Sequence, residues 1–496
     1  MSSIRQFAGQ TIVYGIGSIL SKVVYYLLVV VLLTHLLDGR SFEFGTYGEL
    51  YGYVTVLIIL FSFKLDTALF RFGNKEENLE EAFNTTASLV LMSSALILFC
   101  GLMFTHELAS LIDYEDKPQY IRWFSFILAF DVLALIPFAR LRLLNKAKLF
   151  AGLKIFNVLL SSLLIVFFLI VYPRISESSI VSWIPQFEYQ IDYVFLTNLI
   201  ASAILLGLLL YFVRGFRFKI SRPLLKKMLP YVAPLVVVGV CNNIIQYNGA
   251  AIIKYLSSGS SLLDNLGQSG IFDSSRRIAG LFVLFTGAFN YAAEPFFFNN
   301  SRPEDRESMY GKISHLFVLV GGILILGMVL GLDLLKIMVG KDFEESFFII
   351  PILLAAYLFL GLYHNFTIWY KLSDKTIWGA LISVCGVVLS LIVSFVFIPE
   401  MGYEAFAWAN LVSYFAMVVL AYLLGQKYYP ISYPLKSLFI SILILFLLIV
   451  LAVYLKPLLD TTALYASYGL MFVGFLLYVY QVEKKEWNRI LFRNRS

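Results

Sequence analysis

The stretch LKSLFISILILFLLIVLAVYL, residues 435–455, contains one charged side chain, Lys436. An α-helix of about 20 apolar residues crosses the roughly 30 Å hydrocarbon layer of a membrane. Similar windows recur along the chain, from residue 9 to residue 482. The 496 residues are 60% hydrophobic and 14% charged, whereas soluble domains are about 45–50% apolar and about 25% charged. The sequence therefore predicts an all-α integral membrane protein without a soluble domain.

The apolar windows indicate about fourteen transmembrane helices. Their predicted ranges are 9–37, 45–72, 82–105, 120–144, 149–172, 193–213, 228–256, 271–298, 313–332, 347–370, 377–398, 405–425, 435–455 and 463–482. The first range is longer than the hydrophobic region of a signal peptide, which has about 7–15 residues, so we assign it to a span. An even number of spans places both termini on one side of the membrane.

The distribution of basic residues predicts which side that is. Cytoplasmic loops of membrane proteins are enriched in Lys and Arg. The loops on the side of the termini carry most of these residues, notably within 140–154, 214–227 and 484–495. We therefore predict a protein of the inner (cytoplasmic) membrane with both termini in the cytoplasm. The membrane also explains the net charge of +6, and no nucleic acid is needed as a partner.

The basic stretch 214–227 follows the sixth predicted span and is the best internal boundary. We predict a first six-helix lobe over residues 1–213 and a cytoplasmic linker over residues 214–227. A second six-helix lobe covers residues 228–427. Residues 428–496 add two further helices and a basic cytoplasmic tail.

Several charged residues fall inside or near the ends of the predicted spans. On insertion scales a charge at a helix centre costs about 2.5–3.5 kcal/mol. These residues must therefore form pairs, lie near the interface, or face a water-filled cavity. They are Lys22, Lys64, Asp66, Asp131, Lys254, Asp273, Arg276, Arg277 and Glu294.

Lys22 lies near the middle of the first predicted span. Ser18, Ser21 and Tyr25 share its helix face, because residues three and four apart lie on the same side. One interpretation is an ion pair with a buried acid such as Asp131, and the other is a cation that lines a cavity. Asp131 stands in the middle of the fourth span, so it is itself a candidate cavity or proton-handling group.

The eighth predicted span carries Asp273, Arg276 and Arg277. Asp273 and Arg277 are four residues apart and can neutralise each other on one helix face. Arg276 is then left over, and we expect Arg276 or Arg277 to line a cavity. Lys64 and Asp66, late in the second span, are either interfacial, because lysine side chains reach out to the interface, or functional.

The seventh predicted span is polar without being charged. Asn242 and Gln246 are candidates for a cavity lining, although amides at such spacing also hold membrane helices together. Pro230 and Pro234 remove backbone donors near its start and predict a bend.

The sequence contains no motif for catalysis or metal binding. Cys100, Cys241 and Cys385 lie in apolar runs without metal-ligand spacing, and we find no P-loop, nucleophile elbow or paired zinc histidines. We therefore expect no enzymatic activity, cofactor or metal. More cations than acids in the predicted cavity favour an anionic substrate, such as a lipid with a phosphate head group. Because no nucleotide-binding motif is present, the remaining functions are a transporter driven by a gradient and a facilitator.

Segments along nearly the whole chain resemble the polysaccharide or oligosaccharide flippases of the multidrug/oligosaccharidyl-lipid/polysaccharide (MOP) exporter superfamily, the group that includes O-antigen repeat-unit flippases. No single segment is diagnostic, but their order is specific. They are Tyr-Gly-Glu-Leu (47–50), Thr-Ala-Leu-Phe-Arg-Phe (67–72), Pro-Tyr-Val-Ala-Pro-Leu (230–235), Gly-Ile-Phe-Asp-Ser-Ser-Arg-Arg-Ile-Ala (270–279), Glu-Pro-Phe (294–296), Ile-Trp-Tyr-Lys-Leu (368–372) and Ile-Pro-Glu-Met-Gly-Tyr (398–403).

The resemblance implies two six-helix lobes in a V, as in multidrug and toxic compound extrusion (MATE) transporters, with two added C-terminal helices. It implies alternating access and translocation of a polyprenyl-diphosphate-linked oligosaccharide for cell-surface polysaccharide biosynthesis. Lys22, Arg276 and Arg277 match the positions of substrate-binding cavity cations. Membrane lipids and the machinery that polymerises polysaccharide would be partners.

Four other functions compete with this one. A drug/cation antiporter of the same fold usually has a carboxylate in its first span, where this chain has Lys22. A lipid II flippase would have similar cavity cations. A membrane-embedded glycosyl polymerase would carry a large outer loop with catalytic Arg or His. A purely structural scaffold is disfavoured by the charges inside the spans.

Overall fold

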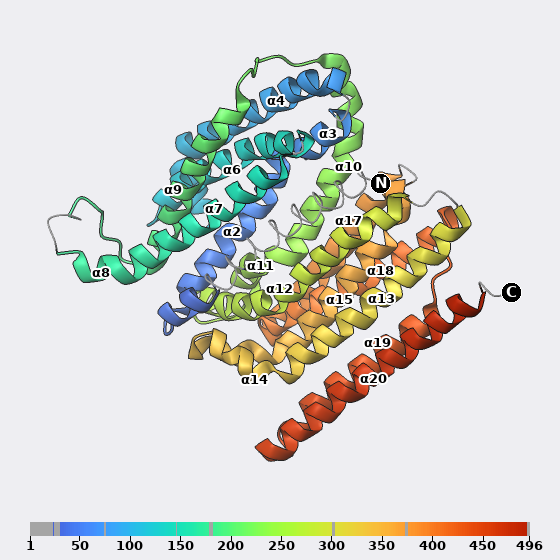
Figure 1. Cartoon of the computed structure of the whole chain (residues 1–496). Coiled ribbons are helices and arrows are strands. Elements are labelled where there is room, and N and C mark those ends of the chain that lie inside the picture. Colours follow the sequence, from blue (N-terminus) through green and yellow to red (C-terminus); the bar gives the residue numbers. More distant parts are fainter. Residues whose placement is uncertain are drawn as a thin grey trace.

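A computed structural model of the chain describes residues 23, 30–73, 76–144, 146–177, 182–299, 303–372 and 375–493. All regular secondary structure in these ranges is helical (Figure 1). Twelve helices in the described part are long and apolar enough to cross a membrane. Most of the first predicted span, including Lys22, lies outside the described residues.

The first group of helices, called here the first bundle, runs from α2 to α9. It consists of α2 (Ser41–Ser62), α3 (Leu65–Phe72), α4 (Glu76–Met103), α5 (Thr105–Leu111), α6 (Gln119–Leu143), α7 (Ala147–Val166), the π-helix η1 (Phe167–Val171), α8 (Tyr172–Ile175), α9 (Gln190–Leu210) and the 3-10 helix η2 (Tyr211–Val213). Helices α4, α6, α9 and α7 pack in that order beside one another.

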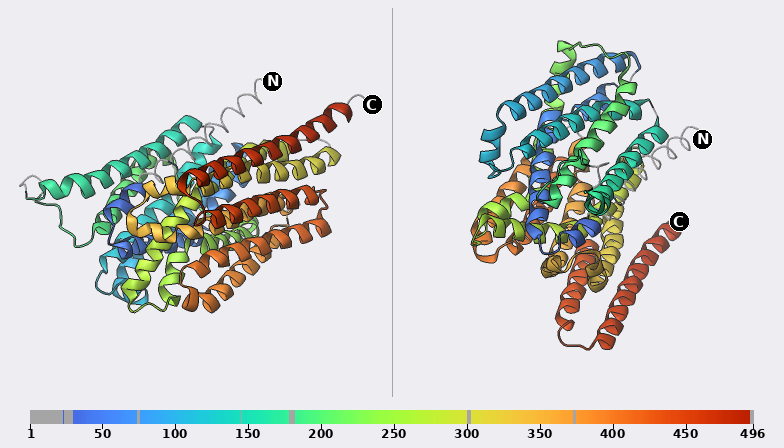
Figure 2. Two further views of the ribbon diagram at one scale, coloured as in Figure 1. Left: turned by 90° about the horizontal axis from the view of Figure 1, so that it is seen from below. Right: turned by 90° about the vertical axis from the view of Figure 1, so that its left-hand side faces the viewer.

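The second bundle runs from α10 to α18, and the C-terminal pair follows it. The second bundle consists of α10 (Arg222–Tyr247), α11 (Gly249–Leu256), α12 (Leu262–Asn299), α13 (Pro303–Leu330), α14 (Leu332–Leu335), the 3-10 helices η3 (Lys336–Met338) and η4 (Lys341–Ile349), α15 (Ile350–Phe366), α16 (Ile368–Leu372), α17 (Thr376–Met401) and α18 (Glu404–Tyr428). The pair α19 (Leu435–Leu455) and α20 (Thr461–Arg493) packs on α13 at the edge of this bundle (Figure 2).

Helix α12 is 38 residues long and is not among the twelve candidate spans. It carries Asp273, Arg276 and Arg277 within one turn and a half. At 1.5 Å per residue its length of about 57 Å exceeds the thickness of a bilayer. The expected number of fourteen spans therefore stays a prediction.

Two interruptions of the predicted spans bear on the site. The span predicted over residues 45–72 breaks into α2 and α3 at Phe63 and Lys64, whose φ angles are 49° and 53°. Left-handed backbone at non-glycine residues costs roughly 1–3 kcal/mol and needs support from its surroundings. In the span predicted over residues 228–256, α10 passes through both Pro230 and Pro234 as one helix, and the break comes at Asn248.

The segment between the bundles is anchored to α4. The backbone N–H groups of residues 217, 219 and 221 donate to side chains of Asn84, Ser88 and Thr85, at 2.9, 3.1 and 3.1 Å. Helix α10 starts at Arg222, so residues 222–227 of the predicted linker already belong to a helix. Ser221 caps it by accepting a hydrogen bond from the N–H of Leu224.

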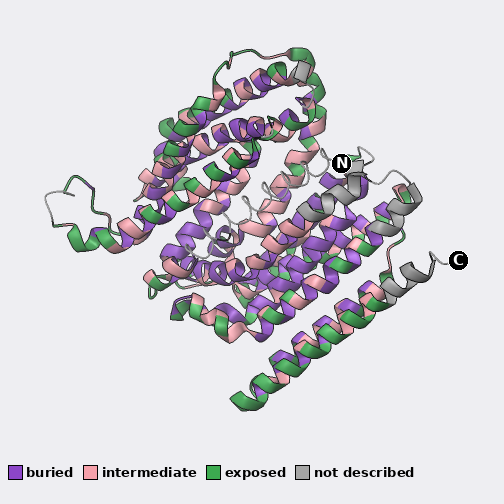
Figure 3. Ribbon diagram, in the orientation of Figure 1, coloured by how far each residue is buried: buried purple, intermediate pink, exposed green. Residues whose placement is uncertain are grey.

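The buried core lies between the helices, and their exposed faces point outward (Figure 3). Many of the exposed side chains are large and apolar. Phe395 on α17, Val450 on α19 and Leu470 on α20 are all exposed. Contiguous exposed apolar surface of this kind is typical of helices that face lipid. The described part of the chain is therefore a multi-pass membrane protein.

Candidate functional site

The two bundles touch where α2 crosses α12. A Cβ atom at Gly45 would lie 1.9 Å from the carbonyl oxygen of Leu266, and one at Gly270 would lie 2.0 Å from the carbonyl oxygen of Ser41. Only glycine allows backbones to approach so closely, as at other helix contacts in membranes. We call this region, formed by residues 38–49, 249–277 and 340–345, the closed end.

Three charged residues of α12 form a group beside this contact. Asp273 accepts from Nε of Arg276 at 2.7 Å and from Nε of Arg277 at 2.6 Å. The second bond joins residues four apart, as predicted. The first corrects the expectation that Arg276 is left over, because one carboxylate serves both guanidinium groups. The group as a whole keeps one net positive charge.

Aromatic rings surround the two arginines, which are almost fully buried. The guanidinium carbon of Arg277 lies 4.7 Å from the ring centre of Tyr47 on α2, across the bundle contact. That of Arg276 lies 5.4 Å from the ring centre of Tyr247, at the end of α10. Rings at this distance attract cations through their negative faces. The charged group is therefore held between the two bundles.

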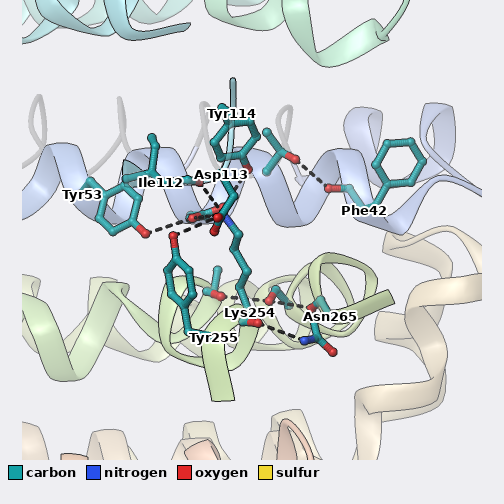
Figure 4. A network of polar contacts seen from close by, with 12 residues as sticks. Phe42, Tyr53, Ile112, Asp113, Tyr114, Lys254, Tyr255 and Asn265 are labelled. Carbon is teal, nitrogen blue, oxygen red and sulfur yellow. Dashed lines mark hydrogen bonds and ion pairs between the residues drawn. The ribbon is translucent and has the colours of Figure 1, made fainter. Parts of the chain in front are cut away.

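A second charged group joins the bundles directly (Figure 4). Nζ of Lys254, on α11, lies 2.9 Å from Oε1 of Glu49, on α2, and both side chains are 0% exposed. Lys254 also donates to the carbonyl oxygen of Ile112 at 2.7 Å. Asp113, half exposed, lies 3.5 Å from the same ammonium.

Two tyrosines complete the coordination of Glu49. The hydroxyl groups of Tyr53 and Tyr114 donate to its two oxygens at 2.9 and 2.7 Å. Tyr114 lies between α5 and α6, outside the spans, where burial and the Glu49 carboxylate raise the pKa of its hydroxyl well above the usual value. Tyr114 therefore stays protonated and remains a donor. Glu49 thereby accepts hydrogen bonds from Tyr53, Tyr114 and Lys254 in a fully buried site.

A third contact lies at the tip of the closed end. The N–H of Gly39 donates to Oδ2 of Asp342 at 2.7 Å, and the N–H of Asp342 donates to Oδ1 of Asp38 at 3.0 Å. This reciprocal pair ties the turn before α2 to η4 of the second bundle. Two polar contacts, the Lys254–Glu49 pair and this one, therefore join the bundles at one end, together with the stacking of Arg277 on Tyr47.

An apolar cavity of about 340 Å³ adjoins the Lys254–Glu49 pair. Leu50 and Tyr53 from α2, Ile112 after α5, Phe124 from α6 and Asn248 after α10 are among its lining residues. Tyr53 and Ile112 also contact the ion pair, so the cavity and the charged group share a wall.

The other predicted site residues are dispersed. Asp131 accepts from Ser202 of α9 at 2.9 Å, inside the first bundle. Lys64 packs beside α10, where a Cβ at Gly239 would lie 3.1 Å from its Cε atom. Asp66 follows on α3 and is half-buried.

Two predicted polar residues lie on α10. The backbone oxygen of Gln246 accepts from Nη1 of Arg276 at 3.5 Å, which places Gln246 beside the α12 group. Oδ1 of Asn242 is buried, and within the described ranges no hydrogen-bond partner reaches it. Among the described residues, no group of His, Cys, Asp and Glu forms a metal site.

Glu49 and the role of Lys254 were missed from the sequence. The sequence only grouped Lys254 with the charges that must pair, lie near the interface or face a cavity; it is fully buried, and Glu49 appeared only within a family-like segment. One local signal was present, since Tyr53 follows Glu49 by four residues and shares its helix face. The partner of Glu49 lies 205 residues away and has no such signal.

Comparison with known proteins places this fold in a class. No family model and no curated protein matches the sequence. A structure of the lipid II flippase MurJ in an inward closed conformation matches with a TM-score of 0.69, at 14% identity over 96% of this chain and 99% of that chain. An inward-facing multidrug resistance MATE transporter of the MOP superfamily matches with a TM-score of 0.56, at 13% identity over 82% of this chain and 94% of that chain.

An outward-facing MATE transporter of the same superfamily gives a TM-score of 0.52, at 12% identity over 84% of this chain and 95% of that chain. Identities this low establish the fold and not the substrate. The chain is therefore a multi-pass membrane protein with the fold seen in MurJ and in MATE transporters.

Proposed function

We propose that this protein is a flippase that moves a polyprenyl-diphosphate-linked oligosaccharide across the cytoplasmic membrane by alternating access. The observation that carries the proposal is the α12 group, in which Asp273 is shared by Arg276 and Arg277 at the bundle contact. A net positive charge at membrane depth is costly and suits an anionic ligand. Arginine binds phosphate oxygens through two parallel hydrogen bonds.

The arrangement of the charges supports one direction of opening. The basic segments around Arg71, Arg140 and the 214–227 stretch lie at the opposite end of the bundles from the closed end, because α2–α3 runs from one end to the other. If those segments are cytoplasmic, as the distribution of Lys and Arg favours, the closed end faces outward. The protein is then closed to the outside and receives its substrate from the cytoplasmic side.

The two bundles act as the two lobes in this proposal. Contacts of the closed end are made across them, by α2 on one side and by α11, α12 and η4 on the other. Separation of these contacts opens the outer side for release. Lys22, which precedes α2, is a further candidate cation for the diphosphate.

Reconstitution with three labelled probes tests this function. The purified protein in proteoliposomes should accelerate translocation of a fluorescent polyprenyl-diphosphate oligosaccharide and leave a lipophilic cationic dye untransported. Arg276→Gln should lower the affinity about ten- to hundredfold, because loss of a charge-assisted contact costs about 1.5–3 kcal/mol. Arg174→Gln, at an exposed site on α8, is the matched control. Transport of the dye alone would establish the antiporter instead.

Lipid II is the second candidate substrate. The MurJ structure matches 96% of this chain, so the match includes most of the C-terminal pair, whereas the MATE matches cover 82% and 84%. This coverage favours a lipid flippase over a drug antiporter. A third probe, fluorescent lipid II, distinguishes the two candidate substrates. The substrate of the protein should be translocated faster than the other polyprenyl-diphosphate lipid.

A further inference from the structure

A second cavity, of about 330 Å³, lies where the C-terminal pair meets the second bundle. Its wall comes from the end of α13, from α14, η3 and η4, and from facing turns of α19 and α20. Leu330, Phe347, Ala452 and Tyr468 are buried apolar members of the wall. The cavity belongs to neither charged group of the closed end, and its volume is in the range of small-ligand sites.

Charged side chains of both signs line the same cavity. Nζ of Lys456 lies 2.7 Å from Oδ1 of Asp333, and Nζ of Lys336 lies 3.3 Å from Oε2 of Glu344. Glu345, which is exposed, accepts from the hydroxyl of Tyr403 at 3.2 Å. The cavity thus presents two ammonium groups and three carboxylates.

These ion pairs are only partly shielded from solvent. The side chains of Lys336 and Glu344 are 36% and 34% exposed. Pairs of this kind contribute about 0–1 kcal/mol. A ligand that offers one negative and one positive group can therefore replace both pairings at little cost, because each protein charge exchanges one partner for another.

The exposed face of the α14–η3 segment indicates that this cavity lies at the interface between membrane and water. Leu334 and Ile337 are 69% and 73% exposed, whereas Asp333 and Lys336 of the same segment line the cavity. Apolar side chains on one face and charges on the other are typical of a segment that lies in the membrane interface. The cavity mouth is then at head-group level.

We propose that this cavity binds the head group of a phospholipid that carries both a phosphate and a primary ammonium. Lys336 and Lys456 would receive the phosphate, and the carboxylates that they now pair with, Glu344 and Asp333, would receive the ammonium. The acyl chains would follow the exposed apolar surface of α19, which starts beside the cavity at Val453 and Tyr454. Carboxylates outnumber ammonium groups here, which disfavours a purely anionic lipid. A bound lipid would join the C-terminal pair to the second bundle.

Native mass spectrometry of the full chain, with phosphatidylethanolamine, phosphatidylcholine or phosphatidylglycerol added, tests the site. We expect phosphatidylethanolamine to bind best, and a Lys336→Gln, Lys456→Gln double variant to bind it about tenfold more weakly. Lys341→Gln, an exposed change in η4 outside the cavity wall, is the matched control. The single Lys456→Gln variant guards against misfolding of the double variant, and equal elution on size exclusion checks all of them.

Two outcomes would overturn the proposal. One is equal or tighter binding of phosphatidylglycerol, and the other is unchanged phosphatidylethanolamine binding in a well-folded double variant. Soluble phosphoethanolamine distinguishes a lipid from a free head group, because it should compete only weakly without acyl chains. Competition as strong as that of the lipid would contradict a lipid site.

Discussion

The two charged groups of the closed end are built differently. Asp273 and its arginines lie on one helix, three and four residues apart, so they remain neighbours whatever the bundles do. Lys254 and Glu49 come from different bundles and are both fully buried. A change that separates the bundles must break this second pair and not the first. We infer that the α12 group is suited to hold a ligand, whereas the Lys254–Glu49 pair is suited to hold the bundles together.

Removal of one member of the Lys254–Glu49 pair, called here the cross-bundle pair, should have the largest effect on stability. Lys254→Met leaves Glu49 charged and buried, and breaking a buried ion pair in this way costs about 3–5 kcal/mol. We expect lower membrane levels and a lower melting temperature in detergent. A Lys254→Met, Glu49→Gln double variant should recover most of that stability, because no buried charge is left alone.

Lys456→Met is the control for that experiment, since it breaks the half-exposed pair with Asp333. It should change stability by about 1 kcal/mol or less. Equal melting temperatures for Lys254→Met and Lys456→Met would show that the cross-bundle pair does not hold the bundles together.

Lys22, which lies outside the described residues, extends the comparison between a ligand-binding charge and a structural one. If Lys22 joins the α12 group in binding a diphosphate, Lys22→Met should abolish flipping at normal membrane levels, since the lost contact is worth about 1.5–3 kcal/mol. Lys22→Arg should keep part of the activity. If Lys22 instead neutralises Asp131, the single variant should lower protein levels, and a Lys22→Met, Asp131→Asn variant should restore both. Complementation together with immunoblotting of membranes separates these results.

The close glycine contact offers a smaller and more local change. Gly45→Ala places a methyl group against the backbone of Leu266, and overpacking of this kind costs about 1–3 kcal/mol. The cost falls only on the state in which the bundles touch, so we expect faster labelling by a water-soluble maleimide of a cysteine introduced in place of Ser41 at the closed end. Gly287→Ala on α12 is the control, because nothing lies within 4 Å of its Cβ position. Equal labelling in both variants would contradict a closed end that opens.

The sequence predicted the apolar helices and, within the site, the Asp273–Arg277 pair but not the Lys254–Glu49 pair. A run of about 20 apolar residues must form a helix in a bilayer, because only then are its backbone polar groups hydrogen-bonded within the segment. The spans could therefore be predicted from the sequence. The Asp273–Arg277 pair was accessible because it is local. Neither Phe63 nor Lys64 favours left-handed backbone, so the break between α2 and α3 has no local signal.

The cross-bundle pair could not be predicted for a different reason. Its members are 205 residues apart, and their partnership depends on how the bundles pack. A single sequence shows which charges are buried in spans, but it does not show which of them meet. Arg276 differs in this respect, because it lies three residues from Asp273 on the same helix and the sequence therefore carried a local signal for that bond.

A reversible crosslink at the closed end tests the central claim most directly. A Cβ at Gly267 would lie 3.2 Å from Oγ of Ser41, which is close enough for a disulfide between cysteines at these positions. Ser41→Cys, Gly267→Cys would be made in a chain whose native cysteines are replaced by alanine, with each single cysteine variant as a control. We predict that oxidation stops substrate translocation in the double variant alone and that dithiothreitol restores it. Undiminished translocation by a fully crosslinked protein would contradict the account.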